Sequence, residues 1–354
     1  AMGILCSDNP GQMIAARKDA PLLIGYGEDG NYIASDVTAL LAHTRTVTYM
    51  EDDEVAVITA DDVQIFDHDR FQLEKEKHEI EWDVSAAEKG GYAHFMLKEI
   101  MEQPEAVRKT ISPRLADGEI VLEELRDAKE LMKNISRIYI VACGSAYHVG
   151  MVGKYALEKM MHIPVEACLA SEFRYSEPIL GESSLVIIIS QSGETLDSMA
   201  ALREAKRRGS KVLSIVNVMG SSIARESDYV LYTWAGPEIA VATTKAYTTQ
   251  MVLLLMFGVY LAKQLDRMEQ EEYMAVTRGL QELPEKISFV LSDIDHYQKA
   301  ASRYFNHNSV FYIGRNLDYA LGLEGSLKLK EISYIHSESY AAGELKHGTI
   351  SLIE

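Results

Sequence analysis

The chain has 354 residues, of which 47% are hydrophobic and 25% are charged. This is the composition of a globular protein, and it excludes disordered and collagen-like classes. There are 35 Lys and Arg residues against 53 Asp and Glu residues, so the formal net charge is −18. Because such a surface repels a phosphate backbone, we expect no nucleic-acid partner.

Short β-rich runs separated by turn signals fill the first 83 residues, a pattern typical of antiparallel strands. We expect these strands to form part of an antiparallel sheet. They are predicted at Gly3–Cys6, Met13–Ala16, Leu22–Gly25, Tyr32–Ser35, Thr46–Tyr49, Val55–Ile58 and Val63–Phe66.

From His94 onward, helical segments alternate with strongly apolar strands, which is the order that builds a doubly wound parallel α/β sheet. One helix is predicted to follow Thr195 and to end at Gly209. The strands are predicted at Arg137–Ala142, Val165–Leu169, Ser184–Ile189, Val212–Val216 and Tyr229–Thr233.

A weak internal repeat indicates a second domain of the same kind. The succession of strand, Gly, helix and Ile-x-x-Glu occurs at residues 138–166 and again at 310–338. We therefore divide the chain into residues 1–83, 84–270 and 271–354. At the repeat spacing the second copy stops before its third strand, so we expect it to be truncated.

Neither a membrane nor a secreted location is indicated. The apolar run Met251–Ala262 is shorter than the roughly 20 residues that cross a bilayer, and no leader pattern stands at Ala1. Cys6, Cys143 and Cys168 are an odd, widely spaced set, which favours neither a disulfide framework nor a zinc site. We expect a soluble protein of the reducing cytoplasm.

The strongest local motif is Ser190-Gln191-Ser192-Gly193-Glu194-Thr195, which lies between a predicted parallel strand and a helix. Hydroxyl groups and unpaired backbone N–H groups at that place can bind a phosphate group without a Lys or an Arg. The alternative is a helix cap rich in Ser and Thr, but a cap uses only one or two of these polar side chains.

Two weaker loops belong to the same hypothesis. Cys143-Gly144-Ser145 ends another predicted strand, and Val241–Thr244 is a third loop of small and hydroxyl residues. Each alone is typical of a simple turn. If both lie at the same sheet edge, they line one crevice. Dinucleotide and P-loop motifs are lacking in the sequence.

The second copy carries ionisable groups instead. Lys328 and Glu331 are three residues apart on a predicted helix, where a carboxylate could move protons and a lysine could hold charge. Glu344, Lys346 and His347 follow. The alternatives are a surface salt bridge and a structural histidine. These residues indicate a phosphosugar-sized site with an acid/base group nearby.

Four longer segments closely resemble the glutamine–fructose-6-phosphate aminotransferase (isomerizing) family. They are Ala170–Tyr175, Ser190–Thr195, Val241–Gln250 and Lys328–Gly348, and the resemblance extends over the whole chain. In that family a glutaminase domain with an N-terminal-nucleophile fold precedes two sugar isomerase (SIS) domains. The resemblance implies that residues 1–83 are the end of the glutaminase domain. It also implies that the family's cysteine nucleophile lies before Ala1, and the imine-forming lysine beyond Glu354.

The resemblance also implies roles for single residues. Glu331 matches the base that moves a proton between the first and second carbons, Lys328 its helper, and His347 the residue that opens the furanose ring across a dimer. Ala146 stands where the family usually has a second hydroxyl residue. The sugar phosphate is expected at Ser145, Ser190, Gln191, Ser192 and Thr195, and the sugar at Val241, Ala242 and Thr243.

The function implied is the glutamine-dependent conversion of D-fructose 6-phosphate to D-glucosamine 6-phosphate, the first step of the hexosamine pathway, by a homodimer. The steps are acid/base and covalent, so we expect no metal and no cofactor. We expect this chain to be inactive alone in the full reaction. The alternatives are an SIS-domain phosphosugar isomerase or deglycase and a non-catalytic phosphosugar-binding regulator. Residues 1–83 argue against the first, and the acid/base residues argue against the second.

Overall fold

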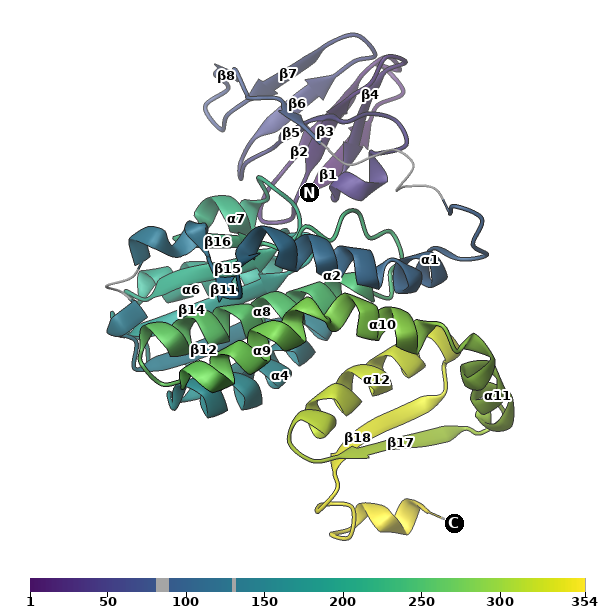
Figure 1. Ribbon diagram of the computed structural model, residues 1–354. Helices are drawn as coiled ribbons and strands as arrows, with labels where there is room; N and C mark the ends of the chain where they lie inside the picture. Colours follow the sequence, from purple (N-terminus) through teal and green to yellow (C-terminus); the bar gives the residue numbers. More distant parts are fainter. Residues whose placement is uncertain (81–88, 129–131, 354) are drawn as a thin grey trace. The chain divides into compact units, whose positions relative to one another are not determined.

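The computed structural model describes residues 1–80, 89–128 and 132–353 and forms two compact units (Figure 1). The first unit contains Ala1–Phe95 with Gly236–Ile239. The second contains Met96–Ala235 and Ala240–Glu354. The domain boundary predicted at residue 83 lies outside the described residues, and the three-part division stays a prediction.

The strands of the first unit pair antiparallel, as predicted, but they form two sheets, which was not predicted. Their strand orders are β1-β2-β6-β7-β8 and β4-β3-β5-β9. The predicted strands are present within one residue of their expected bounds. The bounds are β1 Met2–Leu5, β2 Met13–Ala16, β3 Leu23–Tyr26, β4 Asn31–Ala34, β5 Thr46–Tyr49, β6 Val55–Ile58, β7 Val63–Phe66, β8 Gln72–Leu73 and β9 His78–Glu79, with a short 3₁₀ helix at Val37–Ala39.

One apolar core joins these two sheets. Ala15 and Ala56 come from one sheet and Ile24 from the other, and all three are fully buried in a single cluster with Met50 and Ile65. Because side chains alternate along a strand, each sheet turns one apolar face inward. The inward face of each sheet is buried against the inward face of the other. The strands therefore form two packed sheets instead of one continuous sheet.

The second unit is built around a five-stranded parallel sheet, as predicted. Its order is β13-β12-β14-β15-β16, and Ala142 at the end of β12 pairs with Ile189 near the end of β14. All seven residues of β14 are buried, as expected for a central strand covered on both faces. The bounds are β12 Arg137–Ala142, β13 Val165–Leu169, β14 Ser184–Ser190, β15 Lys211–Val216 and β16 Tyr229–Tyr232.

Helices cover both faces of this sheet. Ile138 and Ile140 of β12 pack in the core formed with α4 and α8, whereas Tyr139 and Val141 pack in the core formed with α5, α6 and α7. Successive side chains of β12 point to opposite faces of the sheet and so contribute to two separate cores. The bounds are α4 Gly144–Met161, α5 Ala170–Phe173, α6 Leu196–Arg207, α7 Ser222–Glu226 and α8 Lys245–Gln264.

Helix α8 contains the apolar run noted in the sequence. Within the described chain it is the one helix whose length and composition would suit a membrane span, and 78% of its apolar window is buried inside the protein. It packs against α4 and β15. This burial is typical of a core helix.

A second β-α-β unit follows, in agreement with the predicted repeat. Ile138 of β12 pairs with Val165 of β13, and Ser309 of β17 pairs with His336 of β18; both parallel pairs join residues 27 positions apart. The bounds are β17 Ser309–Gly314, α12 Leu317–Ser333 and β18 His336–Ala341. The other elements are α1 Phe95–Met101, α2 Gln103–Ile111, β10 Leu115–Ala116, β11 Glu119–Ile120, α9 Gln270–Gln281, α10 Leu283–Leu291 and α11 Ile294–Tyr304, with 3₁₀ helices at Ser112–Arg114, Glu123–Ala128 and Thr349–Leu352.

Candidate functional site

The hydroxyl groups of Ser190–Thr195 are drawn together where β14 ends. The Oγ of Ser190 lies 3.0 Å from the Oγ1 of Thr195 and accepts a hydrogen bond from the backbone N–H of Gly193 at 3.0 Å. The Oγ of Ser192 accepts from the backbone N–H of Glu194 at 3.2 Å. The segment is therefore a compact loop, with hydroxyl groups that can still donate to a ligand.

The helix that follows this loop begins without the usual cap. Thr195 occupies the N-cap position of α6, and in the described structure its hydroxyl bonds Ser190 rather than a backbone N–H of the helix. Cys143, the N-cap residue of α4, likewise gives no side-chain cap there. Helix N-termini of this kind carry unsatisfied N–H groups and partial positive charge, which favour an anion.

These two helix starts belong to the same edge of the sheet. Strands β12 and β14 are hydrogen-bonded neighbours and end level with each other. The Sγ of Cys143 lies 3.8 Å from the Oγ of Ser198 in the first turn of α6. Ser145, two residues after Cys143, is buried in the first turn of α4 at this edge.

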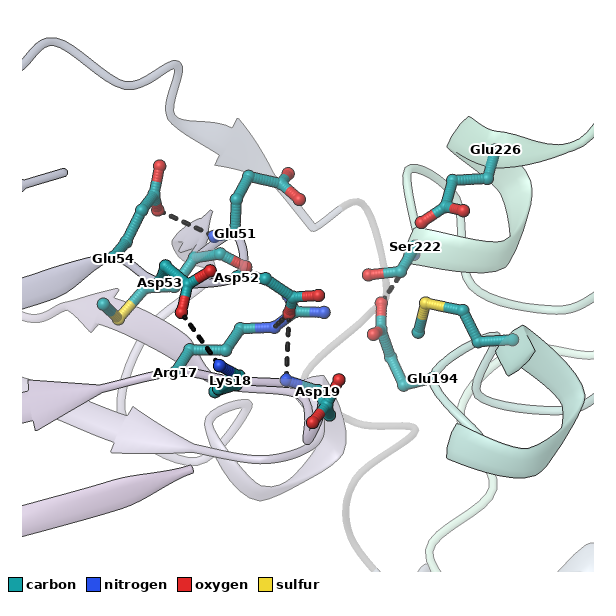
Figure 2. A network of polar contacts seen from close by, with 12 residues as sticks. Arg17, Lys18, Asp19, Glu51, Asp52, Asp53, Glu54, Glu194, Ser222 and Glu226 are labelled. Carbon is teal, nitrogen blue, oxygen red and sulfur yellow. Dashed lines mark hydrogen bonds and ion pairs between the residues drawn. The ribbon is translucent and has the colours of Figure 1, made fainter. Parts of the chain in front are cut away.

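The segment after β15 forms hydrogen bonds with the Ser190–Thr195 loop. The carboxylate of buried Glu194 accepts from the backbone N–H of Ser222 at 2.7 Å (Figure 2). The carbonyl of Gly193 accepts from the N–H of Ile223 at 2.9 Å. Gly193 has φ +68°, and a Cβ there would lie 2.0 Å from the Oγ of Ser221. Only glycine fits this place without distortion.

The third predicted loop is anchored on buried charges that the sequence analysis missed. Lys245, which follows the loop as the first residue of α8, is buried and pairs with Glu102 at 2.7 Å. On the other side, the N–H of Ala240 donates to Glu99 at 3.1 Å. Between these anchors Val241 is fully exposed, and Ala242 and Thr243 are half-buried.

On α12, Lys328 and Glu331 form an ion pair of 2.6 Å, and Glu324 joins it from the same helix face. Nζ of Lys328 is also 3.4 Å from Glu324, whose other oxygen lies 2.7 Å from Nδ1 of His148 on α4. The side chains of Glu324 and Lys328 are only 8% and 16% exposed. The group is therefore buried at its base and reaches solvent at Glu331, which is 37% exposed.

Glu324 and His148 were not predicted as site residues from the sequence. Glu324 precedes Lys328 by four residues, so helical periodicity alone would have placed both on one face. No local signal marks His148, because its partner is 176 residues away.

His347 follows β18 in the chain. It is exposed in the turn after β18, and its backbone N–H donates to the carbonyl of Glu344 at 2.9 Å. Among the residues described, no hydrogen bond or ion pair joins its ring to Lys328 or Glu331.

The described side chains show no arrangement suited to a metal ion. Cys6, Cys143 and Cys168 are free thiols. Within residues 1–80, 89–128 and 132–353, no group of three or more His, Cys, Asp or Glu side chains is arranged to hold a metal.

Comparison with known proteins gives consistent matches. The SIS domain family profile matches residues 131–260 and 303–354. Two curated glutamine–fructose-6-phosphate aminotransferases (isomerizing), from Clostridium acetobutylicum and Caldanaerobacter subterraneus, are 53% and 54% identical over all of this chain. The chain spans 58% of the length of each.

Solved structures agree. The C-terminal domain of a glucosamine-fructose-6-phosphate aminotransferase from Francisella tularensis is 43% identical, with a TM-score of 0.73 and 75% of each chain covered. A structure described as a phosphosugar isomerase from Silicibacter pomeroyi is 29% identical, with a TM-score of 0.61, and the match covers 73% of this chain and 74% of that one.

Proposed function

Because the chain belongs to the SIS domain family and, within it, to the glutamine–fructose-6-phosphate aminotransferases, we propose that it binds D-fructose 6-phosphate and takes part in its conversion to D-glucosamine 6-phosphate. Glutamine is the proposed nitrogen source and glutamate the second product. The observation that carries the proposal is the meeting of two uncapped helix starts with the hydroxyl-lined loop after β14.

The phosphate group is proposed to lie at this edge of the sheet. Hydroxyls of Ser145, Ser190, Ser192 and Thr195 and the amide of Gln191 would donate to its oxygens. The N-termini of α4 and α6 would supply further N–H donors. Val241, Ala242 and Thr243, held between their buried anchors, are proposed to contact the sugar.

Glu331 is proposed as the base that takes a proton from the first carbon of the ring-opened sugar and returns it to the second. Its partial exposure leaves the carboxylate accessible to a substrate, whereas Lys328 is largely buried against it. An ammonium group at that distance can stabilise a developing oxyanion.

His347 is proposed to open the furanose ring in a neighbouring copy of the chain. Its exposed position supports a role across a homodimer. No metal or cofactor enters these steps, since proton transfers and imine chemistry are available to His, Lys and Glu side chains. Cytoplasmic location remains part of this proposal.

Calorimetry with fructose 6-phosphate tests the phosphate site. The double variant Ser192→Ala/Thr195→Ala removes hydrogen bonds to a charged group, each worth roughly 1.5–3 kcal/mol, so affinity should fall about 100-fold or more. Ser302→Ala is the matched control, because that exposed hydroxyl bonds only its own helix on α11. Unchanged affinity in the double variant would contradict the proposal.

Product analysis of the full-length protein separates this function from its rivals. Formation of glucosamine 6-phosphate from fructose 6-phosphate with glutamine or ammonia supports the aminotransferase reaction. Glucose 6-phosphate formation without any nitrogen donor would favour an isomerase. Tight binding with no turnover under either condition would favour a regulator.

A further inference from the structure

A continuous row of ionisable side chains runs from α4 to the accessible face of α12. His148 contacts Glu324 at 2.7 Å, Glu324 contacts Lys328 at 3.4 Å, and Lys328 contacts Glu331 at 2.6 Å. Three of these residues share the α12 face, because they are spaced by four and then three positions. His148 is the member that comes from another helix.

Glu324 needs partners because its carboxylate is buried. An isolated buried charge is costly, and hydrogen bonds with opposite charges offset that cost. The facing groups come from three helices: Lys328 from α12 itself, His148 from α4 and the Tyr247 hydroxyl from α8. Burial and the charge of Glu324 raise the pKa of Tyr247, so this phenol stays neutral.

The contact between His148 and Glu324 has a defined direction. An ionised carboxylate can only accept, so the hydrogen bond requires a proton on Nδ1 of His148. His148 is only 14% exposed and Glu324 8%. This contact therefore fixes the imidazole ring and one oxygen of Glu324, and leaves the other oxygen toward Lys328.

His148 lies on the same helix as the proposed phosphate-binding residue Ser145. His148 follows Ser145 by three residues, so both lie on one side of the first turns of α4. The N-terminus of α4 is the proposed phosphate site. The first turns of α4 therefore carry both Ser145, at the proposed phosphate site, and His148, which contacts Glu324 of the acid/base group.

We propose that His148 is a positioning residue, which fixes the Lys328–Glu331 pair at a set distance from the phosphate-binding end of α4 through its hydrogen bond to Glu324. This inference rests on the proposed function. His148 touches no reacting atom. Its effect is on where Glu331 stands relative to the first two carbons of a sugar whose phosphate is already bound.

The test separates binding from turnover and is made in the full-length protein, because turnover is not expected from this chain alone. His148→Phe keeps the ring volume but removes the donor, so the dissociation constant for fructose 6-phosphate should stay within about twofold. The kcat should fall about 10- to 100-fold, since a displacement near 1 Å can cost this much. His148→Asn retains a donor and should recover a measurable part of the lost kcat.

The control is His162→Asn, at the other end of the same helix. His162 is exposed and has φ +53°, a backbone conformation that Asn tolerates. In this variant the dissociation constant for fructose 6-phosphate and the kcat should both remain unchanged. The melting temperatures of all three variants should be compared with that of the unmutated protein.

The outcomes are distinct. Normal kcat in His148→Phe overturns the inference. Loss of affinity together with kcat in both His148 variants, with lowered melting temperatures, also overturns it, because that result indicates a merely structural role. If the unmutated enzyme neither binds nor converts fructose 6-phosphate, the proposed function itself fails and this inference fails with it.

Discussion

The Nζ of Lys328 lies 2.6 Å from Oε2 of Glu331, one turn of α12 apart, and a second carboxylate, Glu324, holds the same ammonium group from the buried side. A surface salt bridge leaves both charges in water and contributes under about 1 kcal/mol. Here the lysine is largely buried, so its charge acts in a medium of lower polarity than water. The pair thus differs physically from a solvated one.

This difference leads to the first prediction. Glu331→Gln keeps the shape and hydrogen-bonding capacity of the side chain but removes the basic site. Fructose 6-phosphate should still bind, while turnover falls roughly 10²–10⁴-fold. Calorimetry and glucosamine 6-phosphate formation, both with the full-length Glu331→Gln enzyme, measure the two effects.

Glu282→Gln is the matched control for that variant. Glu282 pairs with Lys286 at 2.9 Å on the exposed surface of α10, four residues along. Turnover in this variant should be normal. Near-normal turnover in Glu331→Gln would remove Glu331 from the mechanism.

The second prediction concerns Gly193. An Ala side chain there would meet Ser221 and would also have to adopt a left-handed backbone, which costs roughly 1–2 kcal/mol. Gly193→Ala should lower thermal stability and weaken fructose 6-phosphate binding. Gly181→Ala is the control, because a Cβ there has open space around it. Equal effects of the two changes would argue against a constrained phosphate loop.

Mixing inactive chains tests the placement of His347. If His347 acts in the neighbouring subunit, His347→Asn and Glu331→Gln chains mixed in equal amounts should form some dimers with one intact site. Random pairing then restores about a quarter of the normal activity. Chains of one variant kept separately remain inactive. No recovery after verified exchange of subunits would place both residues in one subunit.

The fourth prediction concerns thiol reactivity. Burial, and then the nearby charge of Glu166, raises the pKa of Cys168 to about 12, and burial raises the pKa of Cys143. Since only the thiolate reacts, both thiols should react slowly with a disulfide reagent near pH 8 and faster as the pH rises toward their pKa values.

Exposed Cys6 provides the internal comparison. One thiol should react rapidly in the folded protein, and all three should react in guanidinium chloride. Three equally fast thiols in the folded state would show that Cys143 and Cys168 are accessible thiolates.

Much of the fold could be predicted from local pattern. Apolar runs such as Arg137–Ala142 and Ser184–Ile189 are bounded by turn residues, and strands of this kind are set by nearby sequence. The separation of the first unit into two sheets was not predicted. Alternation in β2 or β3 shows that one face is buried, but it does not show which other strand covers that face.

The candidate site divides in the same way. Ser190 and Thr195 are close in sequence and meet in one loop, so local chemistry was enough to select them. The contact between His148 and Glu324 depends on how α4 packs against α12. The pairing of Lys245 with Glu102 likewise spans 143 residues. Such contacts require tertiary structure and leave no trace in spacing.

The two β-α-β units with equal strand pairing have a consequence for how this protein could change over evolutionary time or in the laboratory. One unit carries Ser145 in the first turn of its helix, and the other carries ionisable groups along its helix. Duplication of a single ancestral unit, followed by specialisation, would leave substrate recognition and proton chemistry on separately mutable pieces. Libraries directed at the accessible face of α12 could therefore search for new reactions on the substrate class proposed above.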